Sequence, residues 1–240
     1  TIRVDACGLQ CPGPILKMKK TMDSLVSGDR VEITSTDPGF PRDAAAWCNS
    51  TGNQLISKET AGGKSVVVIE KGEPKSCNIV TSCEGKGKTF IMFSDDLDKA
   101  LATFVLANGA AATGQKVTIF FTFWGLNVIK KLHKPNVEKD IFGKMFGMML
   151  PSSSRKLKLS KMSMGGIGGK MMRYIMNRKG IDSLESLRQQ ALENGVEFIA
   201  CQMSMDVMGV KQEELLDEVT IGGVATYMER ADNANINLFI

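Results

Sequence analysis

The chain has 240 residues, of which 43% are hydrophobic and 23% charged, and its formal net charge is +4. These values are ordinary for a soluble globular protein, and the length allows one large domain or two modest ones. No apolar run reaches the roughly 18 residues of a membrane-spanning helix, and no signal peptide opens the chain, which argues against secretion and favours the cytoplasm. The first residue is Thr1 rather than Met, which indicates a processed chain or a piece of a longer one.

The amino-terminal part, residues 1–72, predicts a small α/β domain in which strand-like alternation gives way twice to helical spacing. Gly28 follows the first helical pattern and is expected to close that helix. This β-α-β-α-β-β order is typical of a two-layer domain with both helices on one face of a small sheet. The predicted strands cover 2–7, 30–36, 54–60 and 64–70, and the predicted helices cover 12–28 and 42–52.

Residues 73–87 are polar and rich in glycine and lysine, with little to bury, and we interpret them as a linker. Cys77 and Cys83 lie inside this linker. They are either spare thiols or auxiliary thiols that handle redox chemistry or sulfur.

Residues 88–240 predict a second α/β domain, in which strands and helices alternate. This order is typical of a mostly parallel sheet covered by helices on both faces, in three layers. The segment 126–195, before the third strand, is helical and irregular. The predicted strands cover 89–94, 116–123, 196–201 and 236–240, and the predicted helices outside that irregular segment cover 95–114 and 222–235, with a further one at 183–195.

Cysteines are the residues best suited to chemistry in this chain. There are six of them and a single histidine, His133, and no two cysteines have CxxC spacing. One histidine argues against zinc sites and against histidine-based catalytic triads. Without a signal peptide, the cysteines are expected to be free thiols rather than a disulfide framework. Thiols are therefore the candidate reactive groups by elimination.

Cys11 lies where the first predicted strand meets the first helix, in the stretch "CGLQCPGPIL". Backbone N–H groups at a helix start, and the positive end of the helix dipole, stabilise a thiolate there. Pro12 and Pro14 preset the backbone for a helix start, and Gly13 allows a partner sulfur to come close. Three lysines follow within the helix, so this geometry predicts an exposed and acidic thiol. A cysteine that merely packs is the alternative.

The stretch "DACGLQCPGPIL" resembles the signature of TusA/SirA-like sulfur carriers, whose Cys-Pro-x-Pro cysteine carries a persulfide. The resemblance covers about residues 1–72 and implies that Cys11 is the carrier, supported by Pro12, Gly13 and Pro14. Asn53 stands where many relatives have histidine, a departure that leaves the thiol assignment intact.

Two other cysteines of this domain have weaker claims. Cys7 ends a strand, where it either packs or resolves a disulfide with Cys11. Cys48 is expected on the inner face of its helix.

Cys201 stands at the end of the predicted strand "VEFIAC", with helical sequence after it. Ligands gather outside the carboxyl ends of strands in open α/β sheets, so we expect a second thiol there that is stabilised and exposed. The stretch "FIACQMSMDVMGV" resembles the cysteine segment of DsrE-like proteins, a family with sulfur-transfer and peroxiredoxin-like members, over about residues 88–240. The resemblance implies a reactive Cys201, and a buried core cysteine is the alternative.

The order of the two modules resembles the C-terminal end of fused CoA-disulfide reductase/rhodanese proteins. If a reductase half precedes this chain, its flavin belongs to that other part. The thiol chemistry expected of the present residues requires no metal and no organic cofactor.

Residues 151–181 carry eight basic residues and no acidic ones, and eight of the fifteen methionines lie between Met145 and Met176. Such a surface suits an anionic lipid, an acidic partner or a subunit interface, which we expect within 141–180. A solvated cationic loop beside a methionine-filled core is the alternative. Only Tyr174 offers a stacking ring in the basic stretch, which argues against nucleic acid.

Together these features predict a persulfide sulfur carrier and sulfurtransferase, expected as a homo-oligomer with peripheral membrane contact. Cys11 takes sulfane sulfur from a donor such as a rhodanese-like domain or a cysteine desulfurase, and Cys201 is the second carrier of the relay. The final acceptor is left open. The alternatives are a non-catalytic module that binds RNA or protein, and a thiol-disulfide redox sensor that uses Cys7 and Cys11.

Overall fold

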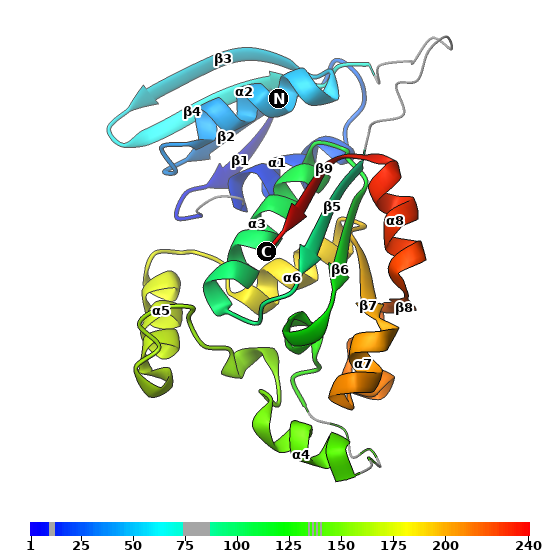
Figure 1. Ribbon diagram of the computed structural model, residues 1–240. Helices are drawn as coiled ribbons and strands as arrows, with labels where there is room; N and C mark the ends of the chain where they lie inside the picture. Colours follow the sequence, from blue (N-terminus) through cyan, green and yellow to red (C-terminus); the bar gives the residue numbers. More distant parts are fainter. Residues whose placement is uncertain (10–12, 74–86, 134, 136, 138, 140) are drawn as a thin grey trace.

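The structure is a computed structural model that describes residues 1–9, 13–73, 87–133 and 141–240, together with 135, 137 and 139. Two sheets organise the chain, one of four strands in the amino-terminal part and one of five strands in the rest (Figure 1). The predicted linker with Cys77 and Cys83 lies almost entirely outside the described residues, as do Cys11 and Pro12.

The amino-terminal domain has two layers, a mixed sheet and two helices. Its elements are β1 (Ile2–Ala6), α1 (Gly13–Asp23), β2 (Arg30–Ser35), α2 (Phe40–Thr51), β3 (Gln54–Ala61) and β4 (Lys64–Glu70). The strand order is β1-β2-β4-β3, with β1 and β2 parallel because α1 crosses between them. β3 and β4 form an antiparallel hairpin whose turn glycines, Gly62 and Gly63, both have positive φ. The predicted β-α-β-α-β-β order is confirmed.

The first helix is shorter than the sequence pattern predicts. It ends at Asp23, so the prediction that Gly28 closes it is wrong. After Asp23, side chains take over the backbone bonds: Ser24 Oγ donates to a helix carbonyl, and the Asp29 carboxylate accepts from the Val26 N–H. Gly28 instead occupies the turn that leads into β2, with φ of 89°.

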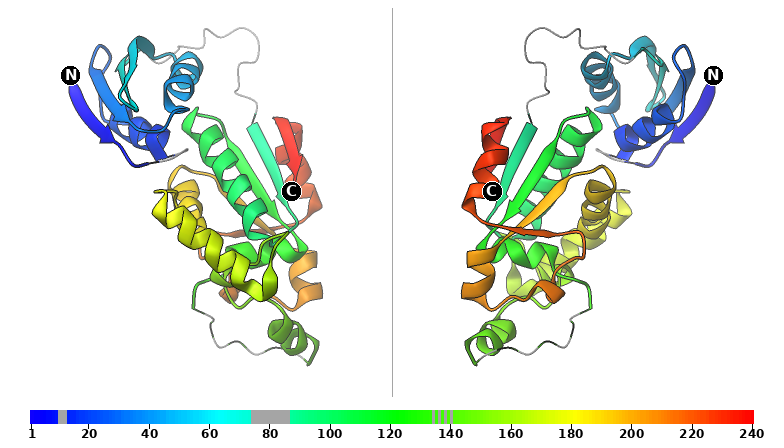
Figure 2. Two further views of the ribbon diagram at one scale, coloured as in Figure 1. Left: turned by 90° about the vertical axis from the view of Figure 1, so that its left-hand side faces the viewer. Right: turned by 90° about the vertical axis from the view of Figure 1, so that its right-hand side faces the viewer.

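The second domain has three layers around a fully parallel sheet. Its strands are β5 (Gly87–Met92), β6 (Val117–Phe121), β7 (Glu197–Cys201), β8 (Thr220–Gly222) and β9 (Ala234–Phe239), and its main helices are α3 (Leu97–Ala112), α6 (Leu184–Glu193), α7 (Gln202–Met208) and α8 (Val224–Asp232). The strand order is β8-β7-β6-β5-β9. α3 and α6 cover one face and α8 covers the other, which confirms the predicted three-layer architecture (Figure 2).

The core of the second domain explains why its central strand, β6, reads as a largely apolar run. Every residue of β6 is buried, as a parallel sheet with helices on both faces requires. On the α3 and α6 face, the rings of Phe104, Phe121 and Phe198 pack with centroids 5.3 to 6.4 Å apart. On the α8 face, a smaller cluster contains Phe120 and Tyr227.

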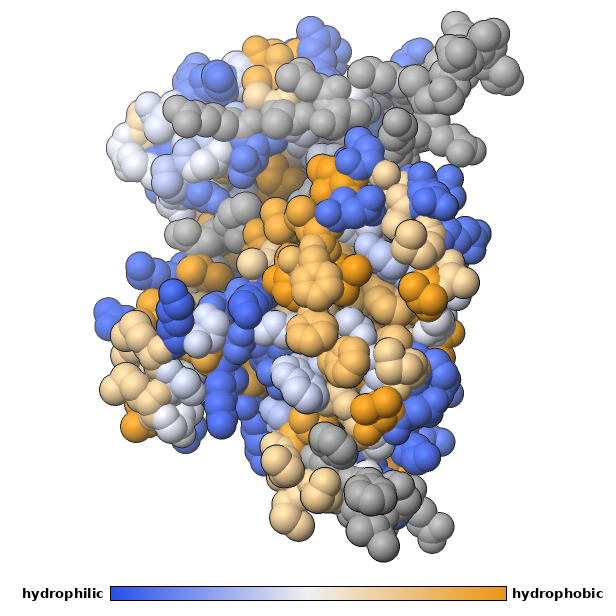
Figure 3. All heavy atoms as spheres, in the orientation of Figure 1, coloured by the Kyte–Doolittle hydropathy of each residue, from blue (hydrophilic) through white to orange (hydrophobic). Residues whose placement is uncertain are grey.

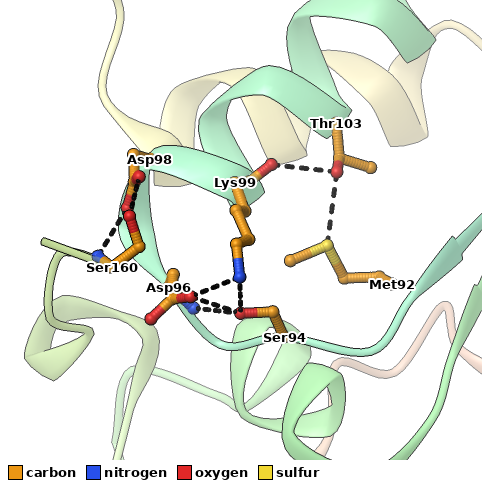
Figure 4. Close-up of polar contacts among 7 residues, drawn as sticks. All are labelled: Met92, Ser94, Asp96, Asp98, Lys99, Thr103 and Ser160. Carbon is orange, nitrogen blue, oxygen red and sulfur yellow. Dashed lines mark hydrogen bonds and ion pairs between the residues drawn. The ribbon is translucent and has the colours of Figure 1, made fainter. Parts of the chain in front are cut away.

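The long insertion between β6 and β7 is fastened to the start of α3 (Figure 4). The Asp98 carboxylate accepts hydrogen bonds from the backbone N–H and the hydroxyl of Ser160, at 2.9 and 2.5 Å. The Leu97 N–H donates to the Lys158 carbonyl at 2.7 Å. The Leu97 bond satisfies one of the donors that a helix start leaves without an internal partner, and the Asp98 bonds hold the Ser160 backbone against the first turn of α3. The insertion carries the 3₁₀ turn η1 (Phe123–Ile129), α4 (Ile141–Met149), the single turns η2 (Ser154–Lys156) and η3 (Met164–Gly166), and α5 (Ile167–Arg178).

The two domains touch on the α3 and α6 side of the parallel sheet. α1 packs against α3, and the Trp47 indole N–H donates to the carbonyl of Ala112 at the end of α3. Figure 2 shows the amino-terminal domain on the side that carries α3, α5 and α6, with α8 on the opposite side. Within the described ranges, no helix combines the length and the apolar character needed to cross a bilayer.

Candidate functional site

The loop predicted to carry the reactive thiol is defined by its flanks, since Cys11 and Pro12 lie outside the described residues. Before them, the Leu9 N–H donates back to the carbonyl of the last residue of β1, at 3.3 Å. After them, α1 begins at Gly13, and both Gly13 and Pro14 are buried. A Cβ on Gly13 would lie 3.2 Å from the Leu9 Cβ, so the loop closes tightly enough to favour glycine. Both flanks agree with a strand-to-helix junction.

Cys7 directly follows β1 and is half-buried beside Asp5. The Cys7 backbone N–H donates to Asp5 Oδ1 at 2.9 Å, and this bond, with a second one from the thiol, holds the pKa of Asp5 below its usual value. The same thiol bond to the carboxylate raises the pKa of Cys7. Less thiolate is then present at neutral pH, which makes Cys7 a weak nucleophile. The acidic residue two positions before the cysteine was a usable sequence signal that pattern reading missed.

Cys48 lies on the inner face of α2, as predicted, and is 1% exposed. Burial raises the pKa of its thiol to about 11, because a low-dielectric interior disfavours the charged form. A thiol that is both hidden and weakly acidic packs rather than reacts.

Cys201 is the last residue of β7, and α7 begins at the next residue, so the predicted strand-to-helix junction is confirmed. The exposure expected there is wrong, because the Cys201 side chain is only 6% exposed. The reason is the alternation along β7: Phe198 and Ala200 face α3 and α6, so Ile199 and Cys201 face α8. The sequence pattern identifies the strand end but not the helix that covers it.

The cover over Cys201 comes from α8. Tyr227 is 8% exposed and packs on Phe120, with ring centroids 5.2 Å apart, in the same cluster as Cys201. The Tyr227 hydroxyl lies 3.2 Å from the Thr89 hydroxyl, which gives this buried polar tip a partner. Sequence reasoning missed Tyr227, because no local pattern shows which face a later helix will cover.

A strained turn follows β6 at the carboxyl edge of the sheet. Phe123 has φ of 47°, a region where a bulky residue costs of order 1–3 kcal/mol. The hydroxyl of Thr122, just before it, lies 2.7 Å from the hydroxyl of Ser204 in α7. The strained turn is therefore joined to the helix that starts directly after Cys201.

Aromatic rings gather beside this turn. The Phe93 ring lies 5.4 Å from Phe123 and 5.7 Å from Phe239, between ring centroids. Phe239 is 68% exposed and Trp124 is 44% exposed, so the group reaches the surface. Figure 3 shows hydrophobic side chains across this part of the molecule. The carboxyl edge thus offers aromatic faces at the ends of β5, β6 and β9.

The predicted site residues are not brought together. The flanks of the Cys11 loop face α3 and α6, whereas Cys201 lies on the opposite face of the sheet, under α8. Among the residues that the structure describes, no group of three or more His, Cys, Asp or Glu side chains is arranged to hold a metal ion. Each cysteine therefore has to be considered by itself.

Two family models match the chain, one for each domain. Residues 85–239, well over half of the chain, match the DsrE/DsrF/DrsH-like family. The chain belongs to this family. Residues 2–71 match the family described as Sulfurtransferase TusA. The TusA/SirA-like and DsrE-like resemblances are confirmed, and the two units are called the TusA domain and the DsrE-like domain below.

Individual relatives agree with this division. The chain is 44% identical over 155 residues to the uncharacterised protein YrkE of Bacillus subtilis, covering 65% of this chain and 97% of YrkE. It is 38% identical over 161 residues to the sulfur carrier protein DsrE2 of Allochromatium vinosum, covering 65% of this chain and 99% of DsrE2. The sulfur carrier protein TusA of the same organism is 43% identical over 68 residues, covering 28% of this chain and 90% of that protein. Each relative thus corresponds in length to one domain here, and the resemblance to CoA-disulfide reductase fusions stays a prediction.

Proposed function

We propose that this chain is a persulfide sulfur carrier and sulfurtransferase, with Cys11 as the carrier thiol. The observation behind the proposal is the position of the Cys-Pro-Gly-Pro stretch in a TusA domain, where Gly13 and Pro14 are the first two residues of α1. One relative named a sulfur carrier protein, DsrE2, matches the DsrE-like domain, and another, TusA, matches the TusA domain. Both matches support a role in sulfur relay. Cys7 and Cys48 both have raised pKa values, which leaves Cys11 as the candidate nucleophile of the TusA domain.

The proposed step moves one sulfur atom without net oxidation or reduction. The Cys11 thiolate attacks the outer sulfur of a donor persulfide, R–S–SH. A new S–S bond forms on Cys11 while the S–S bond of the donor breaks, and the donor leaves as the thiolate R–S⁻. The product is Cys11–S–SH. The start of α1, two residues after Cys11 in the sequence, stabilises the attacking thiolate.

The donors that fit this step carry a persulfide on a protein cysteine, as a rhodanese-like domain or a cysteine desulfurase does. Cys201 is the proposed second carrier, and the acceptor beyond it is left open. We place the chain in the cytoplasm as a homo-oligomer, with the relay operating through thiols alone.

Incubation with inorganic polysulfide is expected to add one sulfur atom to the chain, and peptide mapping by mass spectrometry is expected to place it on Cys11. Cys11→Ser should abolish this gain because the nucleophile is lost. Cys7→Ser is the matched control, since it removes a neighbouring thiol of raised pKa and should load as the wild type does.

Two other results would contradict the carrier. Loss of two hydrogens without gain of sulfur would identify a redox sensor that uses Cys7 and Cys11. Sulfur on none of the cysteines would favour the non-catalytic binding module.

We also propose that the basic, methionine-rich segment 141–180 contacts an anionic membrane surface. On α5, Ile167, Met171 and Tyr174 follow one another at helical spacing and are 64%, 46% and 62% exposed. Residues 151–181 hold eight basic residues and no acidic ones. An exposed apolar stripe beside cationic charge suits a helix that lies in a membrane interface. Figure 3 shows the same mixture of hydrophobic and hydrophilic side chains over α5.

Phosphatidylglycerol vesicles are expected to sediment the wild-type chain at low salt, and phosphatidylcholine vesicles are not. Met171→Glu should weaken this binding about tenfold or more, because it places a negative charge in the apolar stripe. Met228→Glu makes the same change on α8, at a side chain 50% exposed, and should leave binding unchanged. A chain that ignores both vesicles, yet self-associates less after Met171→Glu, would show a subunit interface instead.

A further inference from the structure

The contact between the TusA domain and the DsrE-like domain has a buried anchor. Trp47 is 4% exposed and donates its indole N–H to the carbonyl of Ala112 at the end of α3. Ala112 belongs to the DsrE-like domain but packs in the core cluster of the TusA domain, together with Trp47 and Phe40. A buried tryptophan whose N–H is satisfied is the type of residue that dominates protein interfaces.

The same contact reaches the loop that carries Cys11. Gly180, in the turn after α5, has φ of 66°, and a Cβ placed on it would overlap the carbonyl oxygen of Gly8. A cavity of about 520 Å³ opens between the domains, and its walls include Leu9 and Gly13, the described residues nearest to Cys11 on either side. Both flanks of the carrier loop therefore face the DsrE-like domain.

Opposite charges line the two walls of this cavity. The wall from the DsrE-like domain includes Asp182 and Glu193, at the two ends of α6. The α1 wall is basic on balance. Lys19 pairs there with Asp23 at 2.7 Å, and Lys17 and Lys20 complete the charged lining of this wall. Complementary charges of this kind favour one docking orientation and weaken as salt is added.

We propose that the end of α3, α6 and the Gly180 turn form a docking surface for the TusA domain, and that docking restricts the carrier loop to small sulfur donors. A protein donor has to bind the flanks of the loop, where α6 and the Gly180 turn already lie. It can exchange sulfur with Cys11 only after the two domains part. The docking surface is inferred from the contacts of Trp47 with Ala112 and of Gly180 with Gly8. Only the restriction of sulfur exchange rests on the proposed function.

Gly180→Ala tests the docking surface in the full chain, because the new methyl group would press against Gly8. The two tryptophans give separate indole N–H signals by NMR, and Trp124, 44% exposed and outside the contact, serves as an internal reference. We expect solvent exchange of the Trp47 indole N–H to accelerate about tenfold or more, with no change at Trp124. The radius of gyration from X-ray scattering should rise in parallel.

Gly195→Ala is the matched control. Gly195 also follows a helix, with φ of 77°, but its new methyl group would have nothing within 4 Å. Gly195→Ala adds the same backbone strain, but its methyl group contacts nothing. Indole exchange at Trp47 and the radius of gyration should therefore stay at wild-type values. Trp47→Phe keeps a ring but removes the donor, and should also raise the radius of gyration. If Gly180→Ala and Gly195→Ala behave alike, the docking surface is wrong.

Sulfur loading separates docking from the proposed function. Inorganic polysulfide should load Cys11 equally fast in Gly180→Ala and in the wild type. A persulfide carried on a rhodanese-like protein should load Gly180→Ala about tenfold faster. Loading by neither donor would refute the carrier function and leave the docking result standing. If the domains separate in Gly180→Ala but the protein donor loads Cys11 at the same rate in this variant and in the wild type, docking does not restrict the donor.

Discussion

Sulfane sulfur on Cys11 is expected to reach Cys201 only after the TusA domain leaves its docked position. The docked TusA domain lies on the α3 and α6 side, whereas Cys201 lies on the other face of the sheet, under α8 (Figure 2). The packed sheet between them offers no route for direct thiol exchange. Gly180→Ala should therefore raise the rate of label transfer to Cys201 about tenfold, measured with labelled sulfur and peptide mass spectrometry.

Transfer within one chain is expected to be independent of protein concentration. A flexible linker of the predicted range, 73–87, would span roughly 20 to 25 Å on average and about 50 Å when extended. Such a tether holds the two thiols at an effective concentration of about millimolar. Transfer that accelerates with concentration would place the relay between chains of an oligomer and contradict the relay within one chain.

Cys201→Ser should leave all label on Cys11, because no second carrier remains. Cys48→Ser is the matched control, since Cys48 is also a buried thiol, 1% exposed against 6% for Cys201, and its loss should not change transfer. α8 has to open before Cys201 can react, so alkylation of Cys201 in the native chain should be slow. Label that stays on Cys11 in the wild type and in Gly180→Ala alike would show that Cys201 is a core cysteine.

The architecture of both domains could be predicted because the buried face of each helix or strand sets the spacing of its apolar residues. Strand β6 reads as an apolar run interrupted only by Thr118, and the parallel sheet with helices on both faces explains why. The end of α1 could not be predicted, since it depends on competing side-chain bonds from Ser24 and Asp29 rather than on Gly28. β8 has three residues, too few for alternation to be recognised.

The sequence allowed us to predict where the candidate cysteines lie along the strands and helices, but not which side chains surround them. The strand-to-helix junction at Cys201 follows from local pattern, whereas its burial depends on Tyr227, which comes from a helix later in the chain. The raised pKa of Cys7 depends on Asp5, only two residues away, and could have been predicted. The role of Trp47 in the domain contact depends on α3, and no local signal indicates it.

Gly125→Ala is expected to destabilise the DsrE-like domain by at least about 2 kcal/mol, because the turn after β6 leaves no room for a side chain. A Cβ on Gly125 would overlap the backbone carbonyl of Met92, the last residue of β5. That carbonyl already accepts the Thr122 N–H at 3.1 Å, and the Gly125 N–H donates to the Phe93 carbonyl at 2.9 Å. Neither backbone segment can move without losing these bonds. The loss should appear as a lower urea midpoint for β5 and β6, read by hydrogen exchange.

Gly109→Ala separates this clash from the general effect of adding a methyl group. Gly109 lies inside α3, and a Cβ there would have nothing within 4 Å. Alanine in a helix interior is favoured over glycine by about 1 kcal/mol, so this control should raise the same midpoint. The two substitutions are identical in chemistry and should change stability in opposite directions. An unchanged or raised midpoint for Gly125→Ala would show that the Phe123 turn is not packed against the end of β5.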